Sequence, residues 1–396
     1  MTLPLELLTR MTVALRVALF LVLLFTCGLA RDLSLTLVSD APDTGAVCLD
    51  GSPPGYYLRK GFTQPNKWII HMEGGGYCAN ETDCVKRSFT DLGSSKKWKQ
   101  VISVEGLLSD NCFENPHFCG WTVAYIPYCD GGVYSGNVVH PVKVGTNTIY
   151  FRGIRVLDAV IGALLTAGVN NAEHVILTGC SAGGLSTYLH VDRVRKMIPS
   201  NVPMHAIADA GYFIDAPNIH GQYVSRDQGK YIFNMQNGSS GMNQDCIAAY
   251  SNTNDLWKCG LVQYTYQYIK SPIFTYNSAF DTWQLANILQ LGCLPPKCSE
   301  EQMKQLEHYG QEFMAAVSPV IQSPTNGAFI DSCLIHCQSL GRTSWTQFKV
   351  DNQTVGDTFY AWMTGNTTVY KSKVVDCAYP CNPTCPKTAA SPDETV

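Results

Sequence analysis

Residues 174–197 read HVILTGCSAGGLSTYLHVDRVRKM, and this stretch decides the fold of the chain. Its first five residues predict a buried strand, and residues 185–197 predict a helix. Between them, Gly179-Cys180-Ser181-Ala182-Gly183 fits the pattern G-x-S-x-G. A strand that enters this pentapeptide and a helix that leaves it are typical of a nucleophile elbow, a sharp turn that lifts a serine hydroxyl above the end of a sheet. A simple tight strand-to-helix turn is the alternative.

Strands and helices continue to alternate on both sides of this stretch. The apolar patterns predict strands at 68–72, 122–127, 203–208 and 272–276 and helices at 152–167 and 300–317. This alternation indicates an α/β fold with a mostly parallel central sheet that helices cover on both faces. Segment 216–270 is rich in Asn, Gln, Ser, Tyr and Gly, and we expect it to form a polar insertion or cap beside the sheet.

The N-terminus has the pattern of a secretory signal peptide. Residues 1–30 combine Arg10 and Arg16 with a short apolar run and a small-residue exit near Ala30; a signal anchor is the alternative. Their removal leaves 16 of the 17 cysteines, an even number that suits complete disulfide pairing, and a net charge of −5. We therefore expect a secreted, extracellular protein without stable membrane association after signal cleavage. A single domain is predicted over 31–385, with a disordered tail at 386–396.

Composition excludes several other classes of protein. Charged residues make up 15% of the chain and hydrophobic residues 45%, which excludes a disordered chain. The sequence contains no long run of basic residues, so it does not predict binding to nucleic acid. Four N-x-[ST] sequons are glycosylation candidates where they are exposed; these are Asn80, Asn237, Asn352 and Asn366.

Cysteine spacing leaves the pairing open. The close spacings Cys78/Cys84, Cys112/Cys119 and Cys293/Cys298 are compatible with disulfides but do not establish them. Cys377, Cys381 and Cys385 recur at every fourth residue near the C-terminus. A zinc site is one reading of these three, and secretion favours disulfides.

A serine at an elbow needs a base and a carboxylate to act as a nucleophile. The chain order in such folds is serine, carboxylate, histidine. Of the histidines after Ser181, His336 is the preferred base, because it lies near the end of the globular region between Cys333 and Cys337.

Four carboxylates compete for the third position: Asp209, Asp215, Asp281 and Asp331. Asp281 follows a late strand by five residues and is preferred, with Asp209 next. Asp331 is so close to His336 in sequence that a turn or cap role is favoured.

An oxyanion formed at the serine needs backbone N–H donors. One is expected from Ala182, directly after the serine. The segment Glu73-Gly74-Gly75-Gly76-Tyr77 follows an early strand, and its glycines allow N–H groups to point at a substrate. Gly75 and Gly76 are therefore the other candidates.

Several motifs in the same order resemble the plant pectin acetylesterases and, more distantly, the animal Notum carboxylesterases. They are AVCLDGSPPGY (46–56), EGGGYC (73–78), YCDGGVYSG (128–136), TGCSAGG (178–184), DAGYFID (209–215), NSAFDTWQ (277–284), DSCLIHCQ (331–338) and YPCNPTC (379–385). Tyr77 and Val191 depart from the family pattern, where Trp and Cys are common, so a family disulfide map is not carried over.

The resemblance implies a disulfide-stapled α/β-hydrolase that needs no metal and no organic cofactor. It implies a catalytic triad of Ser181, Asp281 and His336, with Gly75, Gly76 and Ala182 as oxyanion donors. It also implies a serine esterase that removes O-acetyl groups from pectin in the cell wall, and we expect a monomer.

Other functions remain open at this stage. One alternative is hydrolysis of another acyl group, such as the lipid ester that Notum removes from a protein, which needs a deep apolar tunnel. A non-catalytic carbohydrate-binding protein is a further alternative. A net charge of −5 is unfavourable for a polyanionic substrate, so a local basic groove is expected, with Arg152, Arg155 and Lys86-Arg87 as its candidates.

Overall fold

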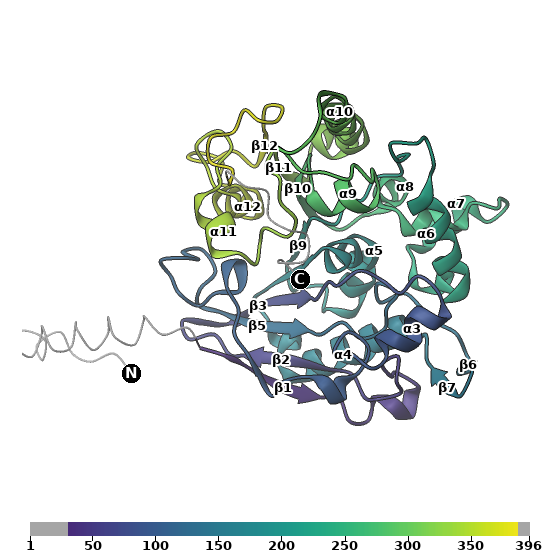
Figure 1. The fold of residues 1–396 in the computed structure, drawn as a ribbon. Helices are drawn as coiled ribbons and strands as arrows, with labels where there is room; N and C mark the ends of the chain where they lie inside the picture. Colours follow the sequence, from purple (N-terminus) through teal and green to yellow (C-terminus); the bar gives the residue numbers. More distant parts are fainter. Residues whose placement is uncertain (1–30, 387–396) are drawn as a thin grey trace, which may run out of the picture.

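A computed structural model describes residues 31–386, which form a ten-stranded sheet with helices on both faces (Figure 1). The predicted signal segment 1–30 and residues 387–396 of the predicted tail lie outside the described residues. The strand order is β12-β11-β10-β9-β8-β3-β5-β2-β1-β4. The strands are β1 (Leu33–Leu37), β2 (Gly55–Arg59), β3 (Gln64–Met72), β4 (Val101–Ile102), β5 (Trp121–Ile126), β8 (His174–Cys180), β9 (Met204–Asp209), β10 (Ile273–Ser278), β11 (Gly327–Asp331) and β12 (Lys373–Val375).

The sheet is parallel from β12 to β5 and antiparallel at its other edge. All pairs from β12 through β8 and β3 to β5 are parallel, whereas β2, β1 and β4 add as antiparallel strands. The predicted mostly parallel sheet is therefore confirmed. Strands β3, β5, β8, β9 and β10 were predicted at nearly these positions, and β1, β2, β4, β11 and β12 were not. A separate two-stranded ribbon consists of β6 (Val142–Val144) and β7 (Asn147–Ile149).

Two apolar layers hold the sheet between helices. One layer packs Trp68, Ile70 and Met72 against α4, α5 and α10, and the other packs Ile69 and Ile176 against α11 and α12. Alternate residues of β3 thus enter opposite layers, as the period of a strand requires. The helices are α3 (Glu81–Arg87), α4 (Gly153–Ala167), α5 (Ala182–Met197), α6 (Val224–Met235), α7 (Gln244–Tyr250), α8 (Val262–Thr265), α9 (Thr282–Asn287), α10 (Glu300–Gln322), α11 (Arg342–Gln347) and α12 (Val355–Thr364).

Segment 216–270 contains more regular structure than its polar composition indicated. It forms α6, α7 and α8, although none of the α6 side chains is fully buried. Figure 1 shows β3 and β5 running toward the side of the molecule where α3, α6 and α7 lie. The expected cap therefore stands at the carboxyl edge of the parallel strands. No helix within residues 31–386 has the length and apolar character to cross a membrane.

All sixteen cysteines of residues 31–386 are paired. The bridges are Cys48–Cys129, Cys78–Cys84, Cys112–Cys119, Cys180–Cys337, Cys246–Cys259, Cys293–Cys298, Cys333–Cys385 and Cys377–Cys381. The three close spacings seen in the sequence are all pairs. Val191, which stands where the family commonly has a cysteine, is buried in the core. Its replacement of that cysteine leaves no described cysteine unpaired.

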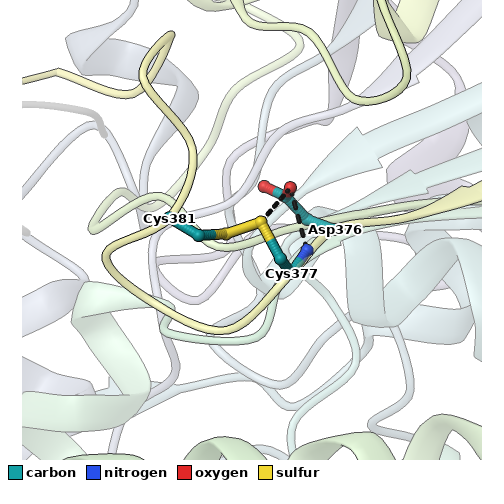
Figure 2. A group of neighbouring side chains, drawn as sticks. All are labelled: Asp376, Cys377 and Cys381. Carbon is teal, nitrogen blue, oxygen red and sulfur yellow. Dashed lines mark hydrogen bonds between the residues drawn. A yellow bond between two sulfur atoms is a disulfide. The ribbon is translucent and has the colours of Figure 1, made fainter.

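The C-terminal cysteines are disulfide-bonded, as we expected for a secreted protein. Figure 2 shows the Cys377–Cys381 bridge beside the carboxylate of Asp376, which accepts a hydrogen bond of 3.0 Å from the Cys377 N–H. Cys385 pairs with Cys333 instead. A thiolate, rather than a disulfide sulfur, is the usual protein ligand of zinc, so the bridged form of these cysteines does not suit a zinc site.

Candidate active site

Strand register brings the site segments to one edge of the sheet. Met72, the last residue of β3, pairs with Gly179 of β8, and Cys180 pairs with Asp209 at the end of β9. On the other side of β9, Ser278 at the end of β10 pairs with Asp331 at the end of β11. The chain leaves β3, β8, β10 and β11 at this edge toward the glycine segment, Ser181, Asp281 and His336, respectively.

Ser181 occupies the strained turn that the sequence predicted. Its backbone has φ 58° and ψ −125°, and helix α5 begins at the next residue. A Cβ atom on Gly179 would overlap the Gly183 carbonyl, so this close approach requires glycine. Ser181 is 3% exposed, and its N–H donates to the Asp209 carbonyl at 3.1 Å. The local sequence therefore builds the elbow from a strand, a glycine-flanked serine and a helix N-terminus.

Asp281 and His336 form a direct hydrogen bond. The Nδ1–H of His336 donates to Asp281 Oδ2 at 2.7 Å, and both residues are 1% exposed. The other carboxylate oxygen of Asp281 accepts the Gln284 N–H at 3.0 Å and so caps α9. Asp281 is thus held at both oxygens and fixes the orientation of the imidazole.

His336 is arranged to accept a proton at Nε2. This atom is buried and has no hydrogen-bond partner among residues 31–386, and Ser181 Oγ makes no hydrogen bond to it in this structure. Burial lowers the pKa of His336, but the Asp281 carboxylate more than offsets this effect, so the pKa lies above the usual 6.5. Trp283 stacks near the ring at a centroid distance of 6.3 Å, and Phe213 lies 6.4 Å away.

A disulfide joins the nucleophile strand to the loop of the base. Cys180 precedes Ser181, Cys337 follows His336, and the two cysteine Cα atoms are 5.5 Å apart. Ser181 and His336 are therefore each one residue from the same covalent bridge, although 155 positions separate them in the sequence.

The remaining carboxylates have other partners. Asp209 accepts N–H groups from Gln338 at 2.7 Å and Ser339 at 2.6 Å, and burial raises its pKa to about 6. Asp331 accepts the Cys333 N–H and the side-chain amide of Gln338. Asp215 pairs with Arg226 at 2.9 Å. Of the four candidates, Asp281 alone contacts His336.

The glycine segment 74–76 lies against the elbow. A Cβ atom on Gly74 would stand 3.1 Å from the Cβ of Ser181. Gly75 and Gly76 have φ values of 124° and 65°, in the region that favours glycine. Within residues 31–386, the N–H groups of Gly75, Gly76 and Ala182 donate to no acceptor.

An apolar cavity of about 90 Å³ lies behind two aromatic neighbours of His336, and neither His336 nor Ser181 lines it. Phe213 and Trp283, which flank His336, also line it, together with Tyr77 and Leu185. Its outer wall comes from the cap, through Phe233, Met242 and Trp257. Sequence reasoning did not identify Phe213, Trp283 or Gln284 as site residues, although they stand in the motifs at 209–215 and 277–284.

The predicted basic groove is not formed by its nominated arginines. The Arg152 guanidinium is buried and donates to the carbonyls of Val139 and Gly45. Arg155 donates to Asn137, and Arg87 donates to Leu92 and Gly75. Lys86 alone of the four is exposed.

Comparisons with known proteins show the family of this chain. The pectinacetylesterase family profile matches residues 28–386. Pectin acetylesterases 5 and 11 of Arabidopsis thaliana are 35% and 36% identical to this chain, over 89% and 90% of it and 84% and 93% of their own lengths. The palmitoleoyl-protein carboxylesterase NOTUM of Schmidtea mediterranea is 31% identical over 88% of this chain and 66% of its own length.

The structure of the Wnt deacylase Notum from Drosophila superposes with a TM-score of 0.79. The two share 25% sequence identity, and the alignment covers 90% of this chain and all of that one. The fold is thus a Notum-like α/β-hydrolase fold, as the motifs implied. The protein is a carboxylic-ester hydrolase, and it belongs to the pectinacetylesterase family.

Proposed function

We propose that this protein is a secreted serine esterase that releases acetate from O-acetylated pectin in the cell wall. The observation that carries the proposal is the buried Asp281–His336 pair, whose free Nε2 stands at the same edge of the sheet as the strained Ser181. The relatives named pectin acetylesterases support pectin as the substrate.

In the proposed mechanism Ser181 Oγ attacks the acetyl carbonyl while His336 Nε2 takes its proton. The Asp281 carboxylate holds the Nδ1–H tautomer and stabilises the imidazolium that forms. N–H groups of Gly75, Gly76 and Ala182 bind the oxyanion of the tetrahedral intermediate. His336 then gives its proton to the leaving sugar hydroxyl, which leaves an acetyl-serine that water hydrolyses by the same steps.

The small apolar cavity lined by Phe213 and Trp283, the two aromatic neighbours of His336, favours a short acyl group such as acetyl. Pockets that hold drug-sized ligands measure about 300–1,000 Å³, whereas this cavity measures about 90 Å³. An acetyl methyl needs little room, and a long lipid chain needs a tunnel.

Hydrolysis of a longer acyl ester is the second candidate. The apolar lining of the cavity and its reach into the cap, at Phe233, Met242 and Trp257, favour it. An outward shift of α6 would lengthen the cavity, because Phe233 belongs to this helix.

Secretion is part of the proposal. Eight disulfides within residues 31–386 fit an oxidising compartment. The four sequon asparagines, Asn80, Asn237, Asn352 and Asn366, are all exposed and therefore meet the first requirement for glycosylation. We propose that the protein acts as a monomer.

One experiment tests substrate and mechanism together. Acetate release from acetylated pectin and acetylated xylan, and p-nitrophenolate release from p-nitrophenyl esters of two, eight and sixteen carbons, are measured for the wild type and Ser181→Ala. We expect release from pectin and the two-carbon ester, and its loss in the variant. Equal release by both proteins contradicts the proposed nucleophile. A preference for chains of eight carbons or more supports the second candidate instead.

A further inference from the structure

Arg87, which the sequence nominated for a basic groove, directly contacts the glycine segment 74–76, called the oxyanion segment below. It is the last residue of α3, and its Nη2 donates to the Gly75 carbonyl at 2.7 Å. Its Nε donates to the Leu92 carbonyl at 3.1 Å, so two of the three guanidinium nitrogens are bound to main-chain oxygens. The side chain is half-buried and lies over the Tyr128 ring, 4.9 Å from its centroid.

The Gly75 carbonyl and the Gly76 N–H belong to the same peptide unit. Because a trans peptide is planar, these two groups point in opposite directions. A hydrogen bond that holds the carbonyl on Arg87 therefore turns the N–H away from α3. Rotation of this peptide would turn the carbonyl oxygen into the place of the donor, where it would repel an oxyanion.

Glycines make this peptide unit easy to rotate. Gly75 and Gly76 both have positive φ values, and glycine populates positive and negative φ about equally. No heavy atom lies within 4 Å of a Cβ position built on Gly76, so little packing restrains it. The orientation of this peptide thus depends on the hydrogen bond at its carbonyl.

Helix α3 is itself fixed to the oxyanion segment. The Cys78–Cys84 bridge joins the end of the segment to the helix, and the Ala79 N–H donates to the Asp83 carboxylate at 2.8 Å. Arg87 also lies near Glu73 and Asp130, two buried carboxyl groups whose pKa values it lowers against the larger effect of burial. The guanidinium is therefore held from several sides.

We propose that Arg87 is a positioning residue that orients the Gly75–Gly76 peptide for oxyanion binding. The inference rests on the proposed function, because Gly76 is an oxyanion donor only if Ser181 is the nucleophile. Arg87 does not touch the substrate in this proposal; it acts through the peptide.

Three variants of the full mature chain test the proposal: Arg87→Met, Arg87→Lys and Lys86→Met. Lys86 is the exposed neighbour on the same helix, and its replacement removes the same charge without touching Gly75. The measurements are kcat and KM on p-nitrophenyl acetate, thermal unfolding, and the rate at which a fluorophosphonate labels Ser181.

We expect Arg87→Met to lower kcat by about 10- to 100-fold with KM within about twofold, because loss of an oxyanion donor costs about 10²–10³ and a misplaced donor costs less. Arg87→Lys keeps one donor and is expected to lie between this variant and the wild type. Added guanidinium should restore part of kcat in Arg87→Met and none in Ser181→Ala. Lys86→Met should match the wild type.

The outcomes separate this proposal from the function itself. A folded Arg87→Met with wild-type kcat and labelling rate overturns the positioning role. If Arg87→Met does not fold, Arg87→Lys decides: wild-type kcat, or a change confined to KM, overturns the role. A wild type that neither hydrolyses esters nor reacts with the fluorophosphonate overturns the proposed function first, and with it the role of Arg87.

Discussion

The loop of His336 and the oxyanion segment reach Ser181 from different strands, and they are held in different ways. The first is bound to β8 by Cys180–Cys337, a bridge between positions 157 apart, and the Asp209 carboxylate accepts two of its N–H groups. The second is bridged only to its own helix, by Cys78–Cys84 over six positions, and Arg87 donates to its carbonyl. The base is thus fixed covalently to the nucleophile strand, whereas the orientation of one proposed oxyanion donor, the Gly76 N–H, depends on the Arg87 side chain.

The largest expected effect comes from replacing Asp281, the carboxylate that holds the catalytic base. Asp281→Asn should lower kcat by about 10⁴-fold, because the carboxylate sets the histidine tautomer and stabilises the imidazolium. The asparagine oxygen still caps α9, so the fold should survive. Asp209→Asn is the matched control and should cost less than about tenfold, since Asp209 holds the loop without touching the imidazole. Kinetics on p-nitrophenyl acetate check both, and equal losses would contradict the assignment of Asp281.

The two bridges should differ in stability. In the chain-entropy description of a disulfide, removal of Cys180–Cys337 costs about 5 kcal/mol and removal of Cys78–Cys84 costs about 2 kcal/mol, because the first closes a much longer loop. Urea unfolding of Cys180→Ala/Cys337→Ala and Cys78→Ala/Cys84→Ala measures both. The first variant should also lose activity before it unfolds. A larger loss of stability from the short bridge would contradict the comparison.

The pH dependence of kcat/KM reports on the His336–Asp281 pair and not on the oxyanion segment. His336 must be neutral at Nε2 to accept a proton, so the rate falls tenfold per unit below its pKa. Since Asp281 raises that pKa, the acid limb should lie above pH 6.5. In Asp281→Asn the residual rate should have its acid limb at lower pH. A wild-type limb at or below 6.5 would show that the carboxylate does not act on the imidazole.

The last comparison concerns one carboxyl group with a raised pKa on each side. Burial raises the pKa of Asp209 to about 6 and that of Glu73, beside the oxyanion segment, to about 7. Between the ordinary pKa and these values the folded chain binds more protons at these groups than the unfolded one, so the contribution of each group to stability is largest below its ordinary pKa and is lost as pH rises to the folded-state value. Each group changes the unfolding free energy by at most about 1.4 kcal/mol per pH unit. We expect measurements of the unfolding free energy between pH 4 and 8 to show a weaker pH dependence in both variants. The change should extend up to about pH 6 in Asp209→Asn and up to about pH 7 in Glu73→Gln. Unchanged profiles would count against these shifts.

Local patterns predicted the parts of the molecule that local chemistry determines. The elbow at Ser181 could be predicted because strand, turn and helix are adjacent in sequence. Asp281 and His336 could be nominated from chain order and resemblance, and the structure places them in contact. The central strands could be predicted from their continuous apolar runs.

The rest depended on contacts that are distant in sequence. The pairing of Cys180 with Cys337 is fixed by the register of the whole sheet, which no spacing reveals. Arg87 and Arg152 were nominated for a basic groove at the surface, because a sequence does not show to which carbonyl a guanidinium donates. The edge strand β1 and helix α6 were not predicted, because their exposed positions weaken the apolar pattern. Strands β2 and β11 are buried almost throughout, but each has only five residues and includes a glycine and a charged residue, so neither has a continuous apolar run.

The Cys180–Cys337 bridge also changes what a protease can do to this molecule. The cap, α9 and the loop of Asp281 all lie between the two bridged positions. A single cut anywhere in that interval, for example in the surface turns of the cap, leaves two polypeptides that remain one covalent molecule. Ser181 and His336 stay beside the bridge in the nicked protein, so a band that splits on a reducing gel need not mark an inactive enzyme.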